Sequence, residues 1–204
     1  QMILRRRYWL YYALQFMAGA RRQIFIVFAG FMMVERFHFD VHEVAGLFMA
    51  TLVLNMMVAP ILGRVVAVFG ERAALVFEYI GLAVIFLLYA GIYLFDWGVW
   101  LAIVLYIVDH LFFSLALAIK TYFQKIADPG DIAPTAAVAF TINHIAAVFL
   151  PVALGLLWLT SPMAVFLMAA GMALTSLVLA TLIPRHPEPG HETVLTLPAP
   201  RPAE

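Results

Sequence analysis

Residues 8–34 read YWLYYALQFMAGARRQIFIVFAGFMMV, an apolar stretch of 27 residues with Arg21 and Arg22 at its midpoint. A helix that crosses the hydrocarbon core of a bilayer needs about 20 predominantly apolar residues. A charge at the centre of such a helix costs at least ~2.5–3.5 kcal/mol on insertion scales. Charged residues at this depth usually face a bundle interior or a water-filled cavity. The stretch therefore predicts a membrane-spanning helix with a polar site at mid-depth.

The composition of the whole chain also indicates a membrane protein. Of its 204 residues, 65% are hydrophobic and 12% are charged, whereas soluble domains average about 45–50% and 25%. The net charge is zero, so the chain has no basic field for nucleic acid. The absence of cysteine excludes disulfides and thiolate metal sites. The first residue is Gln1 rather than Met, from which we expect a fragment or a processed product.

Five further apolar stretches follow, and together the six predict an all-α bundle of six transmembrane helices. The predicted spans are Tyr8–Val34, Val44–Gly63, Ala74–Phe95, Val99–Phe123, Ala136–Leu159 and Met163–Ile183. The predicted bundle occupies residues 1–184. After Pro184 the composition shifts to Pro, Glu, Gly and His, which predicts a disordered cytoplasmic tail over residues 185–204.

Lysine and arginine are distributed unequally between the two ends of the predicted bundle. One end has only Arg36, among the acidic residues Glu35, Asp40, Glu43 and Asp96. The other end has nine basic residues: Arg5, Arg6, Arg7, Arg64, Arg72, Lys120, Lys125, Arg185 and Arg201. By the positive-inside rule, this asymmetry places both termini in the cytoplasm. The preference for arginine over lysine and the abundant alanine suggest a GC-rich bacterium, so we expect its inner membrane.

Polar side chains from four predicted spans fall at similar depth in the bilayer: Arg21, Arg22, Asn55, Asp109, His110, Asn143 and His144. Such groups at one depth indicate a shared cavity, because each needs a partner or water. On the helical wheel Arg22 shares a face with Gln15, whereas Arg21 lies ~100° away from Arg22. We therefore predict that Arg22 faces the cavity and that Arg21 pairs with a neighbouring helix.

These residues define a candidate solute site and a candidate proton site. The predicted solute-binding residues are Arg22, Arg21, Gln15, Tyr106 and Asn143. The planar fork of arginine suits a carboxylate or phosphate, which favours an anionic solute. The predicted proton-coupling residues are Asp109, His110 and His144, because histidine changes its charge near neutral pH.

The same residues also have structural interpretations. The arginine pair could form a structural salt bridge with Asp109, which would leave the site to an uncharged solute. His144 could be a hydrogen-bonded interior histidine. Glu78 lies about one turn inside the third predicted span, where a capping or interfacial role is expected. His38 and His42 stand four residues apart, but loop clusters of this kind are usually solvated, so no metal and no other cofactor is predicted.

The junction between the second and third predicted spans, residues 63–73, reads GRVVAVFGERA. It resembles the inner-loop motif of the major facilitator superfamily, with Gly63 and Gly70 at the spacing of its two glycines and Arg72 as a nearby positive charge. The acidic position is Ala67 here and the usual arginine is Glu71, and such a degenerate copy is common in the second half of that family's members. Over residues 5–184 the chain thus resembles the C-terminal six-helix half of these transporters.

The resemblance implies that the first and fourth spans correspond to the seventh and tenth helices of the family, which line its central cavity. Arg22, Asp109 and His110 fall there, and the fifth span, as the eleventh helix, would bring His144 close. Alternating access requires two six-helix bundles that rock around a midplane site. The implied partners are therefore the lipid bilayer, a small-molecule solute, and either an N-terminal six-helix half or a second copy.

The leading hypothesis is secondary active transport of a small anionic solute, coupled to protons, by one half of an alternating-access transporter. A non-transporting assembly or scaffold subunit that binds protein or pigment partners is one alternative, which the aromatic content permits. A haem-binding redox protein with His110 and His144 as axial ligands is another, although no nucleotide or flavin signature accompanies it. No catalytic constellation or glycine-rich phosphate loop is present in the sequence, so we do not expect an enzyme.

Overall fold

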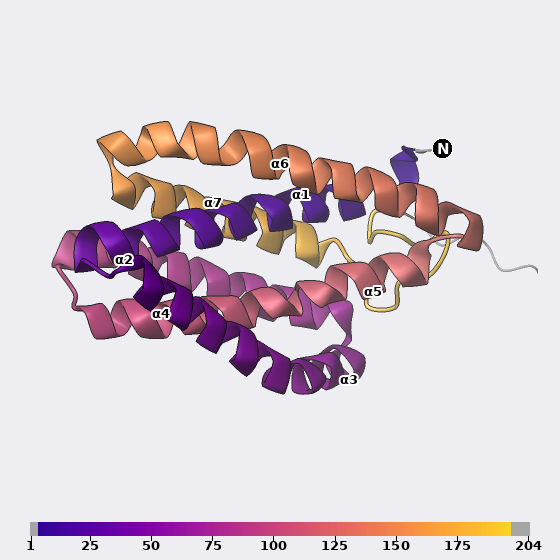
Figure 1. Ribbon diagram of the computed structural model, residues 1–204. Helices are drawn as coiled ribbons and strands as arrows, with labels where there is room; N and C mark the ends of the chain where they lie inside the picture. Colours follow the sequence, from indigo (N-terminus) through magenta and orange to yellow (C-terminus); the bar gives the residue numbers. More distant parts are fainter. Residues whose placement is uncertain (1–3, 197–204) are drawn as a thin grey trace, which may run out of the picture.

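The computed structural model describes residues 4–196 and is a bundle of long helices joined by short connections (Figure 1). No β-strand occurs in that range. Five helical stretches between residues 4 and 196 are long and apolar enough to cross a membrane: Arg6–Phe37, Val41–Phe95, Val99–Ile126, Pro129–Thr160 and Pro162–Thr181. This architecture agrees with the predicted class of an all-α, multi-pass membrane protein.

The first helical stretch is built from four consecutive segments that differ in their helical type. They are the 3-10 turn η1 (Arg6–Tyr8), α1 (Trp9–Gln23), the π-helical η2 (Ile24–Ala29) and α2 (Gly30–Phe37). The π-helical segment begins directly after the Arg21–Arg22 pair. The stretch ends at His38, whose φ of 57° is left-handed and stops the helix.

The 55-residue helix α3 (Val41–Phe95) reverses its direction at Gly70. Its start is fixed by a capping box between Asp40 and Glu43. Gly70 has φ 83° and ψ 163°, a conformation that is open to glycine and strained for residues with a Cβ atom. Figure 1 shows that the arms 41–69 and 71–95 run in opposite directions. The two arms contain the second and third predicted spans, but residues 64–69, predicted to connect these spans, are helical.

The remaining chain forms three more helical stretches. The fourth predicted span is α4 (Val99–Phe113), a 3-10 turn η3 (Ser114–Ala116) and α5 (Leu117–Ile126). After the short turn η4 (Pro129–Asp131), α6 (Ile132–Thr160) and α7 (Pro162–Thr181) follow. The start of α7 is capped by Ser161, whose hydroxyl accepts a hydrogen bond from the Ala164 amide at 3.2 Å.

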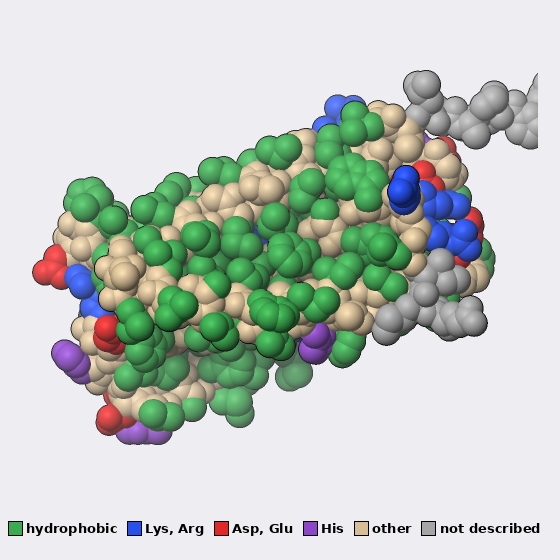
Figure 2. All heavy atoms as spheres, turned by 90° about the horizontal axis from the view of Figure 1, so that it is seen from above, with side chains coloured by type: hydrophobic (Ala, Val, Ile, Leu, Met, Phe, Trp, Pro, Cys, Tyr) green, Lys and Arg blue, Asp and Glu red, His purple; other side chains and the backbone are tan. Residues whose placement is uncertain are grey.

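Helix α3 packs extensively against α7, and α1 packs against α6. The α1–α6 contact is close at Gly19, where an added Cβ atom would lie 2.8 Å from Nδ2 of Asn143. At the acidic end of the bundle the Trp158 indole donates a hydrogen bond of 2.6 Å to Glu35. The face seen in Figure 2 is largely covered by hydrophobic side chains, and most of the charged side chains visible on it gather at the two ends of the molecule.

The described part of the predicted tail, residues 185–196, is packed against the basic end of the bundle. The Glu192 side chain is 5% exposed and lies 3.0 Å from the Arg7 guanidinium. The Tyr122 hydroxyl donates a hydrogen bond to the Glu192 carbonyl, and the Val194 amide donates one to the Leu182 carbonyl at 2.9 Å. These contacts hold residues that composition alone predicted to be disordered. Residues 197–204, with Arg201, and residues 1–3 lie outside the described part of the chain.

Candidate functional site

The adjacent residues Arg21 and Arg22 point into different environments. Arg21 is 1% exposed and lies in the interior of the bundle. Arg22 is exposed and lines a cavity of about 470 Å³. The helical wheel predicts this division, since neighbouring residues of a helix are ~100° apart.

The interior side of α1 places Arg21 against the second arm of α3. Its Nη2 atom lies 3.9 Å from Oε1 of Glu78, and its guanidinium carbon lies 4.3 Å from the centre of the Tyr79 ring. The first distance is that of an ion pair and the second that of a cation–π contact. Glu78 is 0% exposed, so the expected capping or interfacial role for this residue is wrong. The second arm of α3 starts at residue 71 rather than 74, which places Glu78 about two turns inside the helix.

Asp109 on α4 completes this buried cluster. Its side chain is 1% exposed, and its Oδ2 atom accepts no hydrogen bond from the residues that the structure describes. The charged side chains near Asp109 are Arg21 and Glu78. Among residues 4–196 the carboxylate within 4.0 Å of Arg21 is that of Glu78 and not that of Asp109. The salt bridge considered for the arginine pair is therefore made with a different acid.

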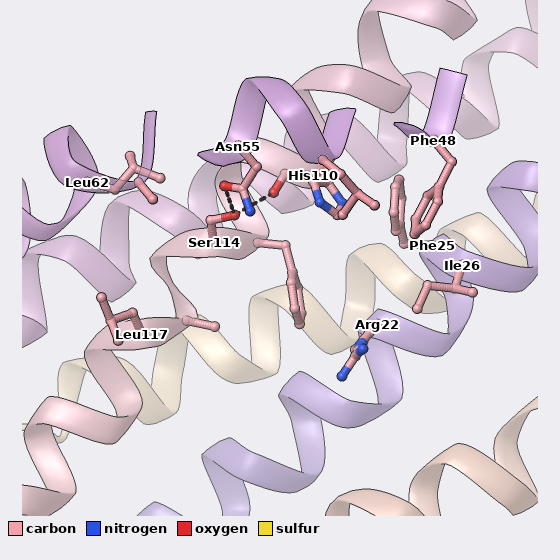
Figure 3. A pocket seen from close by; sticks show the side chains of 13 residues that line it. Arg22, Phe25, Ile26, Phe48, Asn55, Leu62, His110, Ser114 and Leu117 are labelled. Carbon is pink, nitrogen blue, oxygen red and sulfur yellow. Dashed lines mark hydrogen bonds between the residues drawn. The ribbon is translucent and has the colours of Figure 1, made fainter. Parts of the chain in front are cut away.

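The cavity beside Arg22 is bordered by α1 and η2, by the first arm of α3, and by α4 to α5. Its polar lining consists of Arg22, Asn55, His110 and Ser114. Figure 3 shows Asn55, His110 and Ser114 on one wall and Arg22 on the opposite wall. The Ser114 hydroxyl lies 2.6 Å from Oδ1 of Asn55 and 3.0 Å from the His110 carbonyl, so it is held between two acceptors. The rest of the lining is apolar: Phe25, Ile26, Phe48, Leu52, Ala59, Leu62, Phe113, Ala116 and Leu117.

The helices on both sides of this cavity depart from regular α-helical geometry. The wall that carries Arg22 continues as the π-helical segment η2, and the wall that carries His110 ends in the 3-10 turn η3. The ring of Phe25, in η2, lies 5.5 Å from the ring of His110. Single turns of π-helix inside α-helices frequently occur at functional sites. Neither irregularity is predictable from the sequence, because neither segment contains glycine or proline.

A second, smaller cavity of about 290 Å³ lies on the other side of Arg22, between α1 and α6. Its polar lining consists of Tyr11, Gln15, Arg22, Asn143 and His144. The Asn143 amide donates a hydrogen bond of 3.4 Å to the Gln15 carbonyl. Nδ1 of His144 lies 2.8 Å from the carbonyl of Phe140, one turn earlier in its own helix. Arg22 thus borders both cavities and links the predicted residues of α1, α4 and α6.

Two of the predicted groupings are not brought together. Tyr106 is 2% exposed, packs against Phe25 with ring centres 4.8 Å apart, and lines neither cavity that contains Arg22. His110 and His144 line different cavities, so they do not face each other as the axial ligands of one haem would need to.

The residues of the inner-loop motif lie at the basic end, away from these cavities. Gly70 forms the reversal of α3, and together with Arg72 it lines a separate cavity of about 530 Å³ that also contains Arg185 and His186. Gly63 lies within the helical first arm of α3.

Comparison with protein-family models, with curated proteins and with solved structures finds no match to this chain. The geometry of the two cavities that contain Arg22 is therefore the basis for assigning a function.

Proposed function

We propose that this chain transports a small anionic solute across a membrane, as one half of an alternating-access transporter of the major facilitator type. The observation that carries the proposal is the position of Arg22. It lies near the middle of the stretch Arg6–Phe37 and borders two cavities. Among residues 4–196, no carboxylate lies within 4.0 Å of its guanidinium, so its charge is available to a ligand.

The chemistry around Arg22 suits an anion of small size. A guanidinium offers five N–H donors in a planar fork that matches carboxylate and phosphate oxygens. The amide of Asn55 and the ring of His110 lie across the same cavity and can supply further hydrogen bonds. The rest of the lining is apolar, and charge-assisted hydrogen bonds are stronger in surroundings of low dielectric constant.

The proposal includes six membrane crossings, one for each arm of α3 and one for each of the other four stretches. The start of α1, the reversal at Gly70, the α5–α6 junction and the end of α7 lie at the same end of the bundle (Figure 1). This end carries most of the lysine and arginine residues, and it is the cytoplasmic end by the positive-inside rule. From the bias of the sequence towards arginine and alanine we infer that the membrane is a bacterial inner membrane.

A second bundle is required by the exposure of Arg22. In lipid, a polar group at mid-depth must be satisfied by protein or by water in a protected cavity. In this chain Arg22 and His144 are exposed on the sides of α1 and α6. A second six-helix bundle would cover these residues and enclose the two cavities between the halves. It is either an N-terminal half or a second copy of this chain.

Ligand-induced stabilisation of the purified protein tests the anion site. The probes are inorganic phosphate, sulfate, acetate and succinate, with choline chloride at equal ionic strength as the reference. A bound anion raises the midpoint of thermal unfolding in proportion to RT ln(1 + [L]/Kd). We expect at least one probe to stabilise the unaltered protein and the Arg22→Gln variant to lose that effect.

The matched control is Arg64→Gln, because Arg64 is an exposed arginine on the first arm of α3 and lines none of the Arg22 cavities. It should retain the full stabilisation. An Arg22→Gln variant that is stabilised as strongly as the unaltered protein would contradict the anion site. Flux of the stabilising anion into proteoliposomes then tests transport. A protein that binds the anion, forms a stoichiometric complex with another protein and shows no flux would instead support an assembly subunit.

A further inference from the structure

We propose that Arg21, Glu78 and Asp109 form a proton-binding site in which the two carboxylates share one exchangeable proton. This inference rests on the proposed function for its role in coupling, but the chemistry of the site can be tested without transport. The three side chains come from α1, α3 and α4, and each is 0–1% exposed. None of them lines the cavities that contain Arg22.

The charge count of this triad is the first argument. Two ionised carboxylates and one guanidinium carry a net charge of −1, and an isolated charge in a low-dielectric interior is strongly disfavoured. The guanidinium stays protonated under all physiological conditions. The triad therefore becomes neutral by taking up one proton on a carboxylate.

Among the residues that the structure describes, no cation other than Arg21 lies within 4.0 Å of either carboxylate. Besides Arg21, the ionisable side chains near the two carboxylates include the neutral phenols Tyr79, Tyr89 and Tyr106. Helix α7, which packs against α3, contains no ionisable side chain, and His144 of α6 lines the second cavity instead. His110, the neighbour of Asp109, lines the Arg22 cavity.

The hydrogen bonds of the triad are the second argument. Neither oxygen of Glu78 accepts a hydrogen bond from the described residues, and Oδ2 of Asp109 accepts none either. The three guanidinium nitrogens of Arg21 donate no hydrogen bond to these residues. The separation of 3.9 Å between Arg21 and Glu78 is longer than a hydrogen bond. An ionised carboxylate is stabilised by donors, and without them the carboxylic acid form is favoured.

The position of the triad in the chain connects it to the solute site. Arg21 precedes Arg22, and Asp109 precedes His110, so two of its members are covalent neighbours of cavity residues. A negative charge bound at Arg22 lies near the triad and increases its affinity for a proton. By linkage, a proton on the triad increases the affinity for the anion by the same factor. The two ligands then move together, as in symport.

Infrared spectroscopy of the purified full chain tests the shared proton, through the carbonyl stretch of a protonated carboxylic acid. We expect this band at neutral pH in the unaltered protein. Either single variant, Glu78→Gln or Asp109→Asn, should abolish it, because the remaining carboxylate ionises against Arg21. Arg21→Gln should increase it about twofold, because both carboxylates must then be neutral to avoid a buried charge. If Arg21→Gln does not fold, the two single-acid variants decide the question alone.

The control variant is Glu71→Gln. Glu71 is 4% exposed like the acids of the triad, but Lys125 lies 2.7 Å from its carboxylate, so the acid is matched by one cation. This variant should leave the band unchanged. Absence of the band in the unaltered protein, or its persistence in either single-acid variant, would overturn the proposal. Loss of anion stabilisation would remove the proposed transport function and leave this result untouched.

Discussion

Arg21 and Glu78 lie with 3.9 Å between their charged groups, in a part of the bundle where both side chains are sealed from solvent. A buried charge pair adds little to stability when compared with apolar packing, but removal of one partner leaves an uncompensated buried charge that strongly destabilises the fold. Since Asp109 is also near Arg21, the cluster holds one acid more than its cation requires. Because of this surplus, the stability losses caused by single substitutions in the cluster should not add up in a double variant.

Single and double replacements of the two acids should differ sharply in stability. Glu78→Gln or Asp109→Asn alone leaves one carboxylate to balance Arg21, so we expect a loss of about 1 kcal/mol from changed packing and hydrogen bonding. The double variant leaves the guanidinium without a counter-charge, and the expected loss is about 3–5 kcal/mol. Thermal unfolding in detergent measures the three variants. Additive losses in the double variant would contradict a role for Arg21 in balancing both acids.

The affinity for an anion at Arg22 should rise as the pH falls. A proton on the triad removes a negative charge from the vicinity of Arg22, so the protonated form binds an anion more tightly. Sulfate is the suitable probe, because its own charge is constant near neutral pH. Its effect on the unfolding temperature, measured over a pH series, should be largest at the acidic end. In the Glu78→Gln variant the triad keeps one charge state, and this pH dependence should weaken.

Gly19 should not tolerate a side chain. A Cβ atom there would lie 2.8 Å from Nδ2 and 3.2 Å from the backbone carbonyl oxygen of Asn143, so α1 and α6 would have to separate. We expect Gly19→Ala to destabilise the protein by about 1–3 kcal/mol. Gly46→Ala is the control, because an added Cβ atom there has no described neighbour within 4 Å. It should be neutral or slightly stabilising, since alanine favours helix. Equal effects of the two substitutions would show that the α1–α6 contact is adaptable.

The contact between Arg7 and Glu192 should hold the segment 185–196 against the bundle. Arg7 lies within 3.0 Å of Glu192 and 2.8 Å of Asp128, and its side chain is 34% exposed. Glu192→Gln should therefore speed amide hydrogen exchange in this segment, whereas Glu188→Gln, at an exposed position, should not. Because the network is partly exposed, high salt should reduce the difference between the two variants. Identical exchange in both variants would mean that backbone hydrogen bonds alone hold the segment.

The class of fold and the different orientations of the Arg21 and Arg22 side chains could be predicted from the sequence. Apolar stretches of spanning length and the 3.6-residue period of a helix both act locally, so the orientation of Arg22 relative to Arg21 could be predicted. The partner of Arg21 could not, because it depends on where α3 restarts after Gly70. A shift of three residues in that start moved Glu78 from the expected helix end to the interior.

Other features of the structure depend on contacts between residues that are far apart in the sequence, and no local sequence pattern predicts them. The π-helical turn after Arg22 contains ordinary apolar residues, and one of them, Phe25, contacts Tyr106 and His110 on α4, far away in the sequence. The same holds for residues 185–196, whose polar composition predicts disorder. Two of their contacts, from Arg7 and Tyr122, join residues that are 185 and 70 positions apart in the sequence, which a compositional argument cannot detect.

The reversal at Gly70 has a practical consequence for fragmenting this protein. A protease must draw a flexible, extended run of residues into its active site, and exposed loop tips are where nicking concentrates. The residues on both sides of Gly70 are helical, and a single glycine makes the change of direction. Limited digestion should therefore spare this corner, and the two arms of α3 should be recovered as one uncut peptide.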